Sequence, residues 1–273
     1  MTERPLSLVL VGAGKMGSAL LGGWLGRGID GSTITILDPA PSEEAQMAAR
    51  YKGLRVNPPI AEIPAPAVLF LAIKPQTLDE AAPQIAPLVG PETLVLSILA
   101  GKTTSNLKAR LAAATGIVRA MPNTPAAIRR GITAAFATPG VGADQRVTAD
   151  ELLSAVGRVE WLDDETHLDA VTAVSGSGPA YVFLLAECLA EAGAAAGLPA
   201  DLSARLARAT VEGSGELMHR SPEKAVSKLR EEVTSPGGTT AAALTILMGE
   251  SGLKKLMEAA VEAARRRAAE LSG

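Results

Sequence analysis

Short apolar segments alternate with helix-length stretches as far as Trp161, and this alternation restricts the fold more than any other feature. Most of these segments are continuously apolar, which suits strands buried on both faces of a parallel sheet. Strand and helix in alternation predict a doubly wound parallel sheet. The predicted strands are Leu6–Val11, Thr33–Leu37, Val68–Ile73, Leu94–Ile98, Ile117–Met121 and Thr133–Ala137, and the predicted helices are Met16–Arg27, Glu43–Lys52, Leu78–Leu88, Thr104–Thr115 and Ala149–Val156.

The β signal stops after Trp161, and the rest of the chain is predicted to be helical. Pro179 and Pro199 each stand where the first position of a helix is expected, a position that proline favours. This half is rich in alanine and glycine, whose small side chains let helices approach closely. We therefore predict an α/β fold in two domains, a doubly wound sheet over residues 1–164 and an all-α domain over residues 165–273.

A glycine-rich turn follows the first predicted strand. The segment from Gly12 to Gly17 has the spacing G-x-G-x-x-G, with a strand before it and a helix after it. Gly12 would make the tight turn, Gly14 would let the backbone approach a pyrophosphate, and Gly17 would let helix and strand pack closely. The helix that begins near Lys15 offers free N–H groups and a partial positive charge. The pattern predicts a Rossmann-like dinucleotide-binding domain.

Further candidate contacts stand at the ends of the later strands. Asp38 ends the second strand, where an acid usually binds the ribose hydroxyls of NAD, and a turn-forming role is the alternative. By its charge Asp38 disfavours a 2′-phosphate, although Ser42 could donate a hydrogen bond to one. Ligands of open α/β sheets lie outside the carboxyl ends of the strands. We therefore expect Ala72–Pro75, Ala100–Gly101 and Met121–Pro125 to line one edge.

Composition argues against several classes of function. The formal net charge is −3, so bulk electrostatics favour neither nucleic acid nor an anionic membrane. A single cysteine, Cys188, excludes an intramolecular disulfide, and with only two histidines no zinc-type ligand cluster can form. The first residues lack the long apolar core of a signal peptide. We expect a cytoplasmic protein with no metal, no nucleic-acid partner and no membrane partner.

Two glycine- and serine-rich loops precede helices in the second half, at Ser175–Tyr181 and Ser235–Thr240. Serine and threonine just before a helix are good caps, and capping alone is one explanation for them. The N–H groups at a helix N-terminus can also hold a small carboxylate. Two such loops in a domain of plain helices are more than folding requires.

These loops carry a resemblance to a known family. Ser175–Tyr181 together with Val233–Thr240 resembles pyrroline-5-carboxylate reductase, and Leu69–Pro75 and Met121–Pro125 are also similar to it, in the family's order and spacing. The resemblance implies reduction of 1-pyrroline-5-carboxylate to L-proline by NADPH or NADH, the last step of proline biosynthesis. It implies an N-terminal Rossmann domain and a C-terminal helical domain that binds substrate and forms a homodimer, with a decamer in some members.

The resemblance also implies roles for individual residues. The hydroxyl of Thr240 would reach the ring nitrogen of the substrate, which makes Thr240 the candidate catalytic residue. Backbone N–H groups of the same loop would bind the substrate carboxylate. The residues expected around the substrate are Glu165, Ser235, Gly238, Thr239 and Thr240. Those expected to contact the dinucleotide are Val11, Gly12, Ala13, Gly14, Lys15, Met16, Gly17, Asp38, Asn57, Ala72, Ile73, Lys74, Pro75, Leu99, Ala100 and Gly101.

Three other interpretations stay open. A β-hydroxyacid dehydrogenase would share the fold but uses a catalytic lysine early in its second domain, and no lysine lies between His167 and Ala200. A deazaflavin-dependent NADP reductase resembles the N-terminal part but does not explain Ser235–Thr240. A non-enzymatic dinucleotide sensor would bind cofactor without a substrate pocket. The sequence also leaves open the choice between NADH and NADPH and between dimer and decamer.

Overall fold

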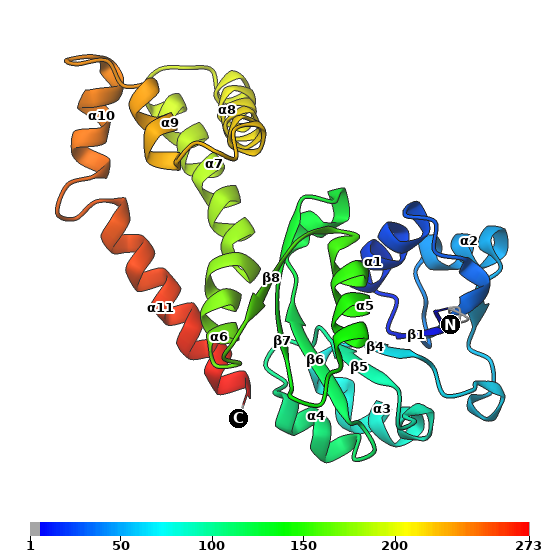
Figure 1. The fold of residues 1–273 in the computed structure, drawn as a ribbon. Coiled ribbons are helices and arrows are strands. Elements are labelled where there is room, and N and C mark those ends of the chain that lie inside the picture. The colour runs from blue at the N-terminus through cyan, green and yellow to red at the C-terminus, as the bar shows by residue number, and fades with distance from the viewer. Residues whose placement is uncertain (1–5, 273) are drawn as a thin grey trace. The chain divides into compact units, whose positions relative to one another are not determined.

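The structure, a computed structural model, describes residues 6–272 and divides into two compact units. Unit 1 contains the chain up to Gly176 together with the last turns from Ala264, and unit 2 contains Ser177–Ala263. Figure 1 shows the sheet and its flanking helices in unit 1 and helices alone in unit 2. This agrees with the predicted fold class. The units are defined by contacts and not by function, so the domain border at residue 164 stays a prediction.

Unit 1 is built on one eight-stranded sheet with the order β3-β2-β1-β4-β5-β6-β7-β8. The six predicted strands are all present. Every residue of β1, β4 and β5 in the middle of the sheet is buried, as their continuous apolar runs predict. The strands are β1 Leu8–Val11, β2 Ile34–Leu37, β3 Arg55–Val56, β4 Val68–Leu71, β5 Leu94–Ser97, β6 Gly116–Met121, β7 Gly131–Ala137 and β8 Gly157–Leu162.

One strand of the sheet corrects the prediction that the strands are all parallel. β7 runs antiparallel to β6, whereas every other pair is parallel. A parallel return needs a crossover of a dozen or more residues, usually an α-helix. Only the short 3₁₀ turn Thr124–Ile128 joins β6 to β7. The chain therefore turns back beside β6 instead of crossing over the sheet.

Two strands, β3 and β8, were not predicted. β3 has two residues, which is too short for a periodic signal. β8 lies at the edge of the sheet, and its exposed residues Arg158 and Glu160 alternate with partly buried ones. Its sequence therefore alternates in polarity and lacks the continuous apolar run of the central strands.

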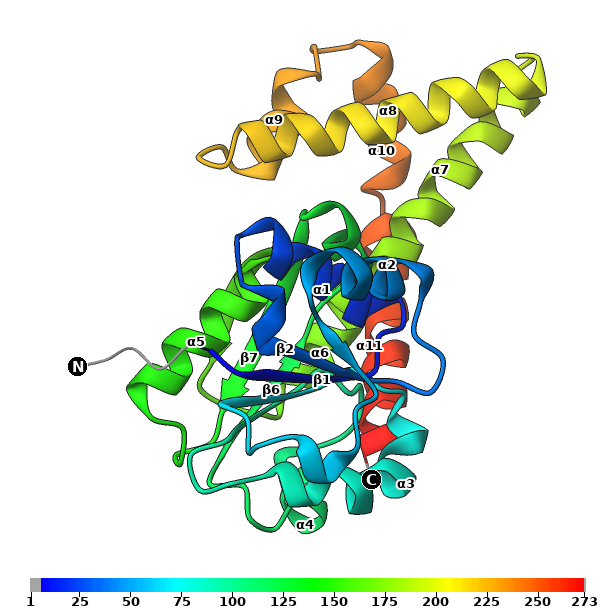
Figure 2. The same cartoon turned by 90° about the vertical axis from the view of Figure 1, so that its right-hand side faces the viewer.

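Helices cover both faces of the sheet. Alternate residues of β1 contribute to two separate cores, Leu8 and Leu10 to one and Val9 and Val11 to the other. The first core also holds residues of α1, α2 and α5, and the second holds residues of α3 and α4, so these helices lie on opposite faces (Figure 2). The helices of unit 1 are α1 Lys15–Gly26, α2 Glu43–Lys52, α3 Leu78–Ile85, α4 Thr104–Arg110, α5 Ala143–Ser154 and α6 His167–Val171.

Unit 2 leaves most of its apolar side chains exposed. Among its described residues, Ala207 is the one buried hydrophobic residue, and no residue of α7 or α10 is buried. The α7–α8 pair is joined by a hydrogen bond from Ser203 Oγ to the carbonyl oxygen of Ala190 (2.6 Å). The helices are α7 Gly178–Ala195, α8 Ala200–Arg220, α9 Val226–Glu232, α10 Thr239–Leu247 and α11 Leu253–Ser272, whose last turns belong to unit 1.

One described segment, His167–Ala195, is long and apolar enough to cross a membrane by length and composition. A single such helix is weak evidence, because helices of soluble proteins also pass this test. The expectation that no membrane partner exists therefore stays a prediction.

Candidate active site

The glycine turn after β1 has a backbone that other residues cannot adopt. Gly12 has φ +96°, and a Cβ there would lie 2.7 Å from the carbonyl carbon of Ala72. A Cβ on Gly17 would collide with the carbonyl oxygen of Gly12. Gly14 precedes α1, and no side chain caps this helix. Because no side chain accepts hydrogen bonds from the first N–H groups of α1, these groups can bind an anion such as a phosphate.

A cavity of about 780 Å³ opens beside this turn. Its volume lies within the usual range for small-molecule and cofactor sites. Eight residues predicted to contact the dinucleotide line it: Val11, Gly12, Gly14, Asp38, Asn57, Ala72, Ile73 and Lys74. The sequence did not identify further lining residues at or after the ends of β2 and β3 and on or just before α3: Leu37, Pro39, Ala40, Pro58, Ile60, Thr77, Glu80, Ala81, Gln84 and Ile85. The glycine cradle, the uncapped helix and the cavity together fit a dinucleotide.

Asp38 is fixed at the end of β2 by backbone donors. Its Oδ2 accepts a hydrogen bond from the N–H of Ala13 (2.6 Å), and its Oδ1 accepts one from the N–H of Ala40 (2.7 Å). The Asn57 amide clamps the Asp38 backbone, because its Oδ1 accepts from the Asp38 N–H (2.9 Å) and its Nδ2 donates to the Asp38 carbonyl (2.7 Å). Asp38 thus links the glycine turn to the rim of the cavity.

The other predicted dinucleotide contacts do not line this cavity. Ala13 is buried and binds Asp38 through its N–H. Gly101 follows β5 with φ +72°, and a Cβ there would lie 2.8 Å from the carbonyl oxygen of Leu271 in the last turns of α11. The roles of these residues stay predictions: Ala13, Lys15, Met16, Gly17, Pro75, Leu99, Ala100 and Gly101.

Glu165, between β8 and α6, has both carboxylate oxygens engaged within unit 1. Its Oε1 accepts hydrogen bonds from the Thr104 N–H (2.8 Å) and from Nη1 of Arg119 (3.1 Å), and its Oε2 accepts one from Thr104 Oγ1 (2.6 Å). Arg119 is a buried residue of β6, and its Nη2 lies 3.9 Å from Oδ1 of Asp169. Glu165 therefore joins α4 to a buried guanidinium. Its contact with substrate stays a prediction.

The two glycine- and serine-rich loops do not serve as helix caps. Gly238 precedes α10 and Ser177 precedes α7, and neither helix has a side-chain cap. A side chain on Gly238 would collide with the hydroxyl of Ser235. Thr240 is half-buried in the first turn of α10. The capping explanation is therefore wrong for both helices, and the start of α10 remains suited to a carboxylate.

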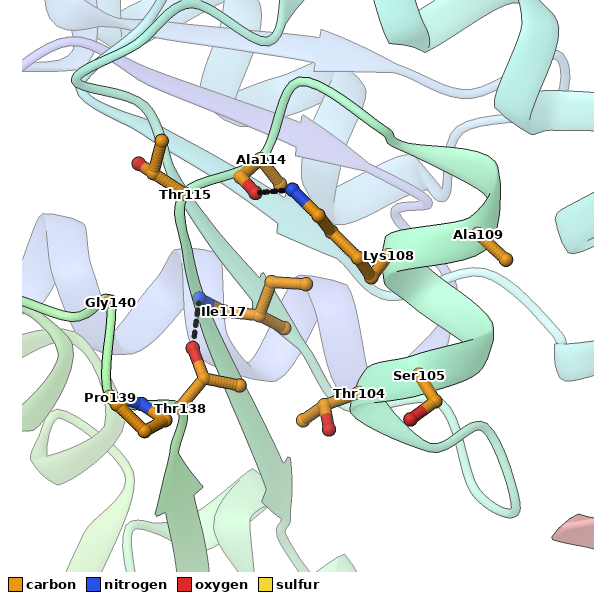
Figure 3. Close-up of a pocket in the computed structure, with 10 residues that line it drawn as sticks. All are labelled: Thr104, Ser105, Lys108, Ala109, Ala114, Thr115, Ile117, Thr138, Pro139 and Gly140. Carbon is orange, nitrogen blue, oxygen red and sulfur yellow. Dashed lines mark hydrogen bonds between the residues drawn. The ribbon is translucent and has the colours of Figure 1, made fainter.

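A second hollow, of about 590 Å³, lies beside α4 in unit 1 and is shown in Figure 3. The ammonium group of Lys108 donates to the carbonyl oxygens of Ala112 (2.9 Å) and Ala114 (2.5 Å) and so satisfies the backbone after the helix. The Thr138 hydroxyl accepts from the N–H of Ile117 (3.1 Å). None of the predicted site residues lines this hollow, and the Lys108 and Thr138 side chains in it serve the backbone.

A doubly wound sheet with a glycine turn and an acid after its second strand defines a dinucleotide-binding oxidoreductase domain, followed here by a helical unit. Comparison with known proteins finds two family models that match different parts of the chain. A family model described as pyrroline-5-carboxylate reductase dimerisation matches residues 165–271. One described as NADP oxidoreductase, coenzyme F420-dependent, matches residues 7–101.

Full-length relatives identify the family. The chain is 41% identical to the pyrroline-5-carboxylate reductase of Pseudomonas aeruginosa, over 97% of this chain and 96% of that one. It is 38% identical to that of Synechocystis, over 97% and 98% of the two chains. The solved structure of a pyrroline-5-carboxylate reductase from Coxiella burnetii matches with a TM-score of 0.89 and 33% identity, over 99% of this chain and 100% of that one. The chain belongs to the pyrroline-5-carboxylate reductase family.

A more distant relative was solved with cofactor. The Plasmodium falciparum pyrroline carboxylate reductase has NADP bound and matches with a TM-score of 0.80 and 28% identity, over 98% of each chain. The extent of the matches also argues against one interpretation that the sequence left open. The similarity to a deazaflavin-dependent reductase is confined to the N-terminal part, whereas the reductase relatives match from end to end.

Proposed function

We propose that this protein reduces 1-pyrroline-5-carboxylate to L-proline with NADPH or NADH, the last step of proline biosynthesis. The observation that carries the proposal is the end-to-end similarity to curated reductases of that name. The cavity beside the glycine turn supports it independently, because its residues fit a dinucleotide.

The chain's own residues bind and orient in this reaction. A bound nicotinamide supplies the hydride that the imine carbon requires. The start of α1 would hold the pyrophosphate with its N–H groups and its partial positive charge. Asp38 and Asn57 line the cavity after β2 and β3, where Asp38 accepts from the Ala13 N–H of the glycine turn and Asn57 donates to the Asp38 carbonyl. These contacts lower the barrier by positioning the reactants, so no strong acid from a histidine or a paired carboxylate is required.

The loop before α10 is the proposed substrate site. The carboxylate of the imine would bind the N–H groups of Thr239 and Thr240, since no side chain caps this helix and no acidic residue stands in its first turn. The Gly238 N–H is not available for it, because it donates to the carbonyl oxygen of Ser235 (3.0 Å). The Thr240 hydroxyl would bond to the ring nitrogen and hold it as the proton arrives. Ser235, beside Gly238, would complete the loop around the ring. Glu165 is the fifth proposed substrate neighbour.

The direct test is turnover. Purified protein is mixed with 1-pyrroline-5-carboxylate and with NADH or NADPH, and the absorbance of the reduced nicotinamide is followed. We expect oxidation of at least one dinucleotide that depends on the imine. The absence of turnover with both, in protein shown to be folded and to bind dinucleotide, would refute the proposed reaction.

We also propose that the protein works as a homodimer formed through unit 2. Large apolar side chains on its helices are exposed in the single chain, including Phe183, Leu185 and Ile246, and contiguous exposed apolar surface marks interaction sites. Light scattering should give at least twice the monomer mass at micromolar concentration. A stable, active monomer would refute the proposal, and ten times the monomer mass would identify a decamer.

The remaining expectations concern the cell. We propose a cytoplasmic enzyme that binds neither nucleic acid nor membrane, because the net charge of −3 gives no attraction to either polyanion. Co-sedimentation with anionic vesicles should leave the protein in the supernatant, and recovery in the pellet would contradict this.

A further inference from the structure

The end of β2 carries an arrangement that bears on the choice between NADH and NADPH. The two cofactors differ by one phosphate on the 2′-hydroxyl of the adenosine ribose, and in folds of this kind that hydroxyl is read at the end of the second strand. Here that position holds Asp38, half-buried on the rim of the cavity. The groups that surround Asp38 therefore decide which cofactor the cavity admits.

The carboxylate cannot turn away from the cavity. Ala13 and Ala40 donate one backbone N–H each to its two oxygens, and Asn57 bonds to both the N–H and the carbonyl of Asp38. An ionised carboxylate has about four acceptor sites. Two are used by these backbone donors, so the remaining ones are available to accept from ribose hydroxyls.

The Ser42 hydroxyl, which by sequence could have bonded to a 2′-phosphate, is engaged within the protein. Ser18 Oγ donates to the carbonyl oxygen of Ala13 (2.8 Å), because a carbonyl can only accept. Ser42 Oγ lies 2.8 Å from Ser18 Oγ, in a hydrogen bond in which either hydroxyl can be the donor. The Ser42 oxygen also accepts from the N–H of Ala45 (3.1 Å). Ser42 is thus committed to capping α2 and to bracing the glycine turn.

Basic side chains are scarce among the described residues that line the cavity. Among the described lining residues, Lys74 is the single basic one, and it follows β4 and not β2. The other charged lining residues are Asp38 and Glu80, both acidic. A phosphate group placed next to Asp38 would meet a like charge without a compensating lysine or arginine.

We propose that Asp38 makes this protein an NADH-preferring enzyme: its fixed carboxylate accepts from the adenosine ribose hydroxyls and repels the 2′-phosphate of NADPH. The inference rests on the dinucleotide part of the proposed function. A like charge at a few ångströms in a half-buried site lowers affinity about 10- to 100-fold.

The test is the ratio of two dissociation constants, measured by isothermal titration calorimetry with NAD⁺ and with NADP⁺. For the unaltered protein we expect NAD⁺ to bind about 10- to 100-fold more tightly. Asp38→Ser should reduce that ratio at least about tenfold, because it removes the charge. Asp144→Asn is the matched control, since it removes one acidic charge from an exposed residue of α5 that does not line the cavity, and it should leave the ratio unchanged.

Equal or tighter binding of NADP⁺ by the unaltered protein would overturn the proposal, as would a ratio that Asp38→Ser leaves intact. If Asp38→Ser does not fold, the ratio for the unaltered protein decides alone. Calorimetry needs no substrate, so the two claims fail separately. Turnover of the imine with tighter NADP⁺ binding would refute the preference only, whereas preferred NAD⁺ binding without turnover would refute the reaction only.

Discussion

Removal of the Arg119 guanidinium should destabilise unit 1 through the carboxylates it leaves behind. The Arg119 side chain is 6% exposed, and its partners Glu165 and Asp169 are 21% and 22% exposed. Loss of one partner of a buried ion pair costs about 3–5 kcal/mol, because the other charge stays buried without compensation. We expect Arg119→Met to cost about 3 kcal/mol, at the lower end of that range, because Glu165 keeps two hydrogen bonds from Thr104.

The assay is urea denaturation followed by circular dichroism, at one fixed protein concentration because assembly contributes to apparent stability. Arg205→Met is the matched control. Arg205 pairs with Asp201 on the surface of α8, with side chains 66% and 74% exposed. Its loss should change the free energy of unfolding by less than about 1 kcal/mol. A second change, Glu165→Gln, added to Arg119→Met should recover part of the loss, because it removes one uncompensated charge.

Equal, small effects of Arg119→Met and Arg205→Met would refute the account of Glu165 as a residue that holds α4 against β6. A double variant less stable than Arg119→Met alone would refute it as well. In that case a contact other than the one with Arg119 would hold the Glu165 carboxylate in place, and a role of Glu165 in substrate binding alone would be favoured.

Three further predictions test the site and the core. Thr240→Ala should lower kcat/KM by an amount that corresponds to a loss of about 2–4 kcal/mol of transition-state stabilisation. Thr240→Ser keeps the hydroxyl and should retain most of the activity. Equal kcat/KM values for the two variants in steady-state assays would contradict the role of that hydroxyl. Gly12→Ala should weaken NAD⁺ binding at least about tenfold in calorimetry, because a Cβ there meets the Ala72 carbonyl, while Gly22→Ala, with open space around its Cβ, should leave affinity unchanged. Trp24→Phe should lower the free energy of unfolding in urea by about 1–3 kcal/mol, because it leaves a buried carbonyl of α5 without its indole donor; a variant as stable as the parent would show that the bond contributes nothing.

Much of unit 1 could be predicted because burial on both faces leaves a strong signal. β1 and β4 are wholly apolar, and β5 is apolar apart from the buried Ser97. The direction of β7 could also have been inferred, since no helix-length stretch separates it from β6. β8 escaped prediction because an edge strand needs no continuous apolar run.

The site divides in the same way. The glycine turn was predictable because its steric demands are local, as the close approach of Gly12 to Ala72 shows. The partners of Glu165 were not, because Thr104 and Arg119 are distant in sequence and only the fold brings them to one carboxylate. Equally, the engagement of Ser42 within the protein follows from hydrogen bonds that no sequence pattern records.

The most direct test of the central claim follows the transferred atom. The protein is incubated with 1-pyrroline-5-carboxylate and with NADH or NADPH that carries deuterium at the transferable position of the nicotinamide, and the product is analysed by mass spectrometry. The account predicts L-proline that has gained a single deuterium at the former imine carbon, in an amount equal to the dinucleotide oxidised. Unlabelled proline, or no proline from folded protein that binds dinucleotide, would contradict it.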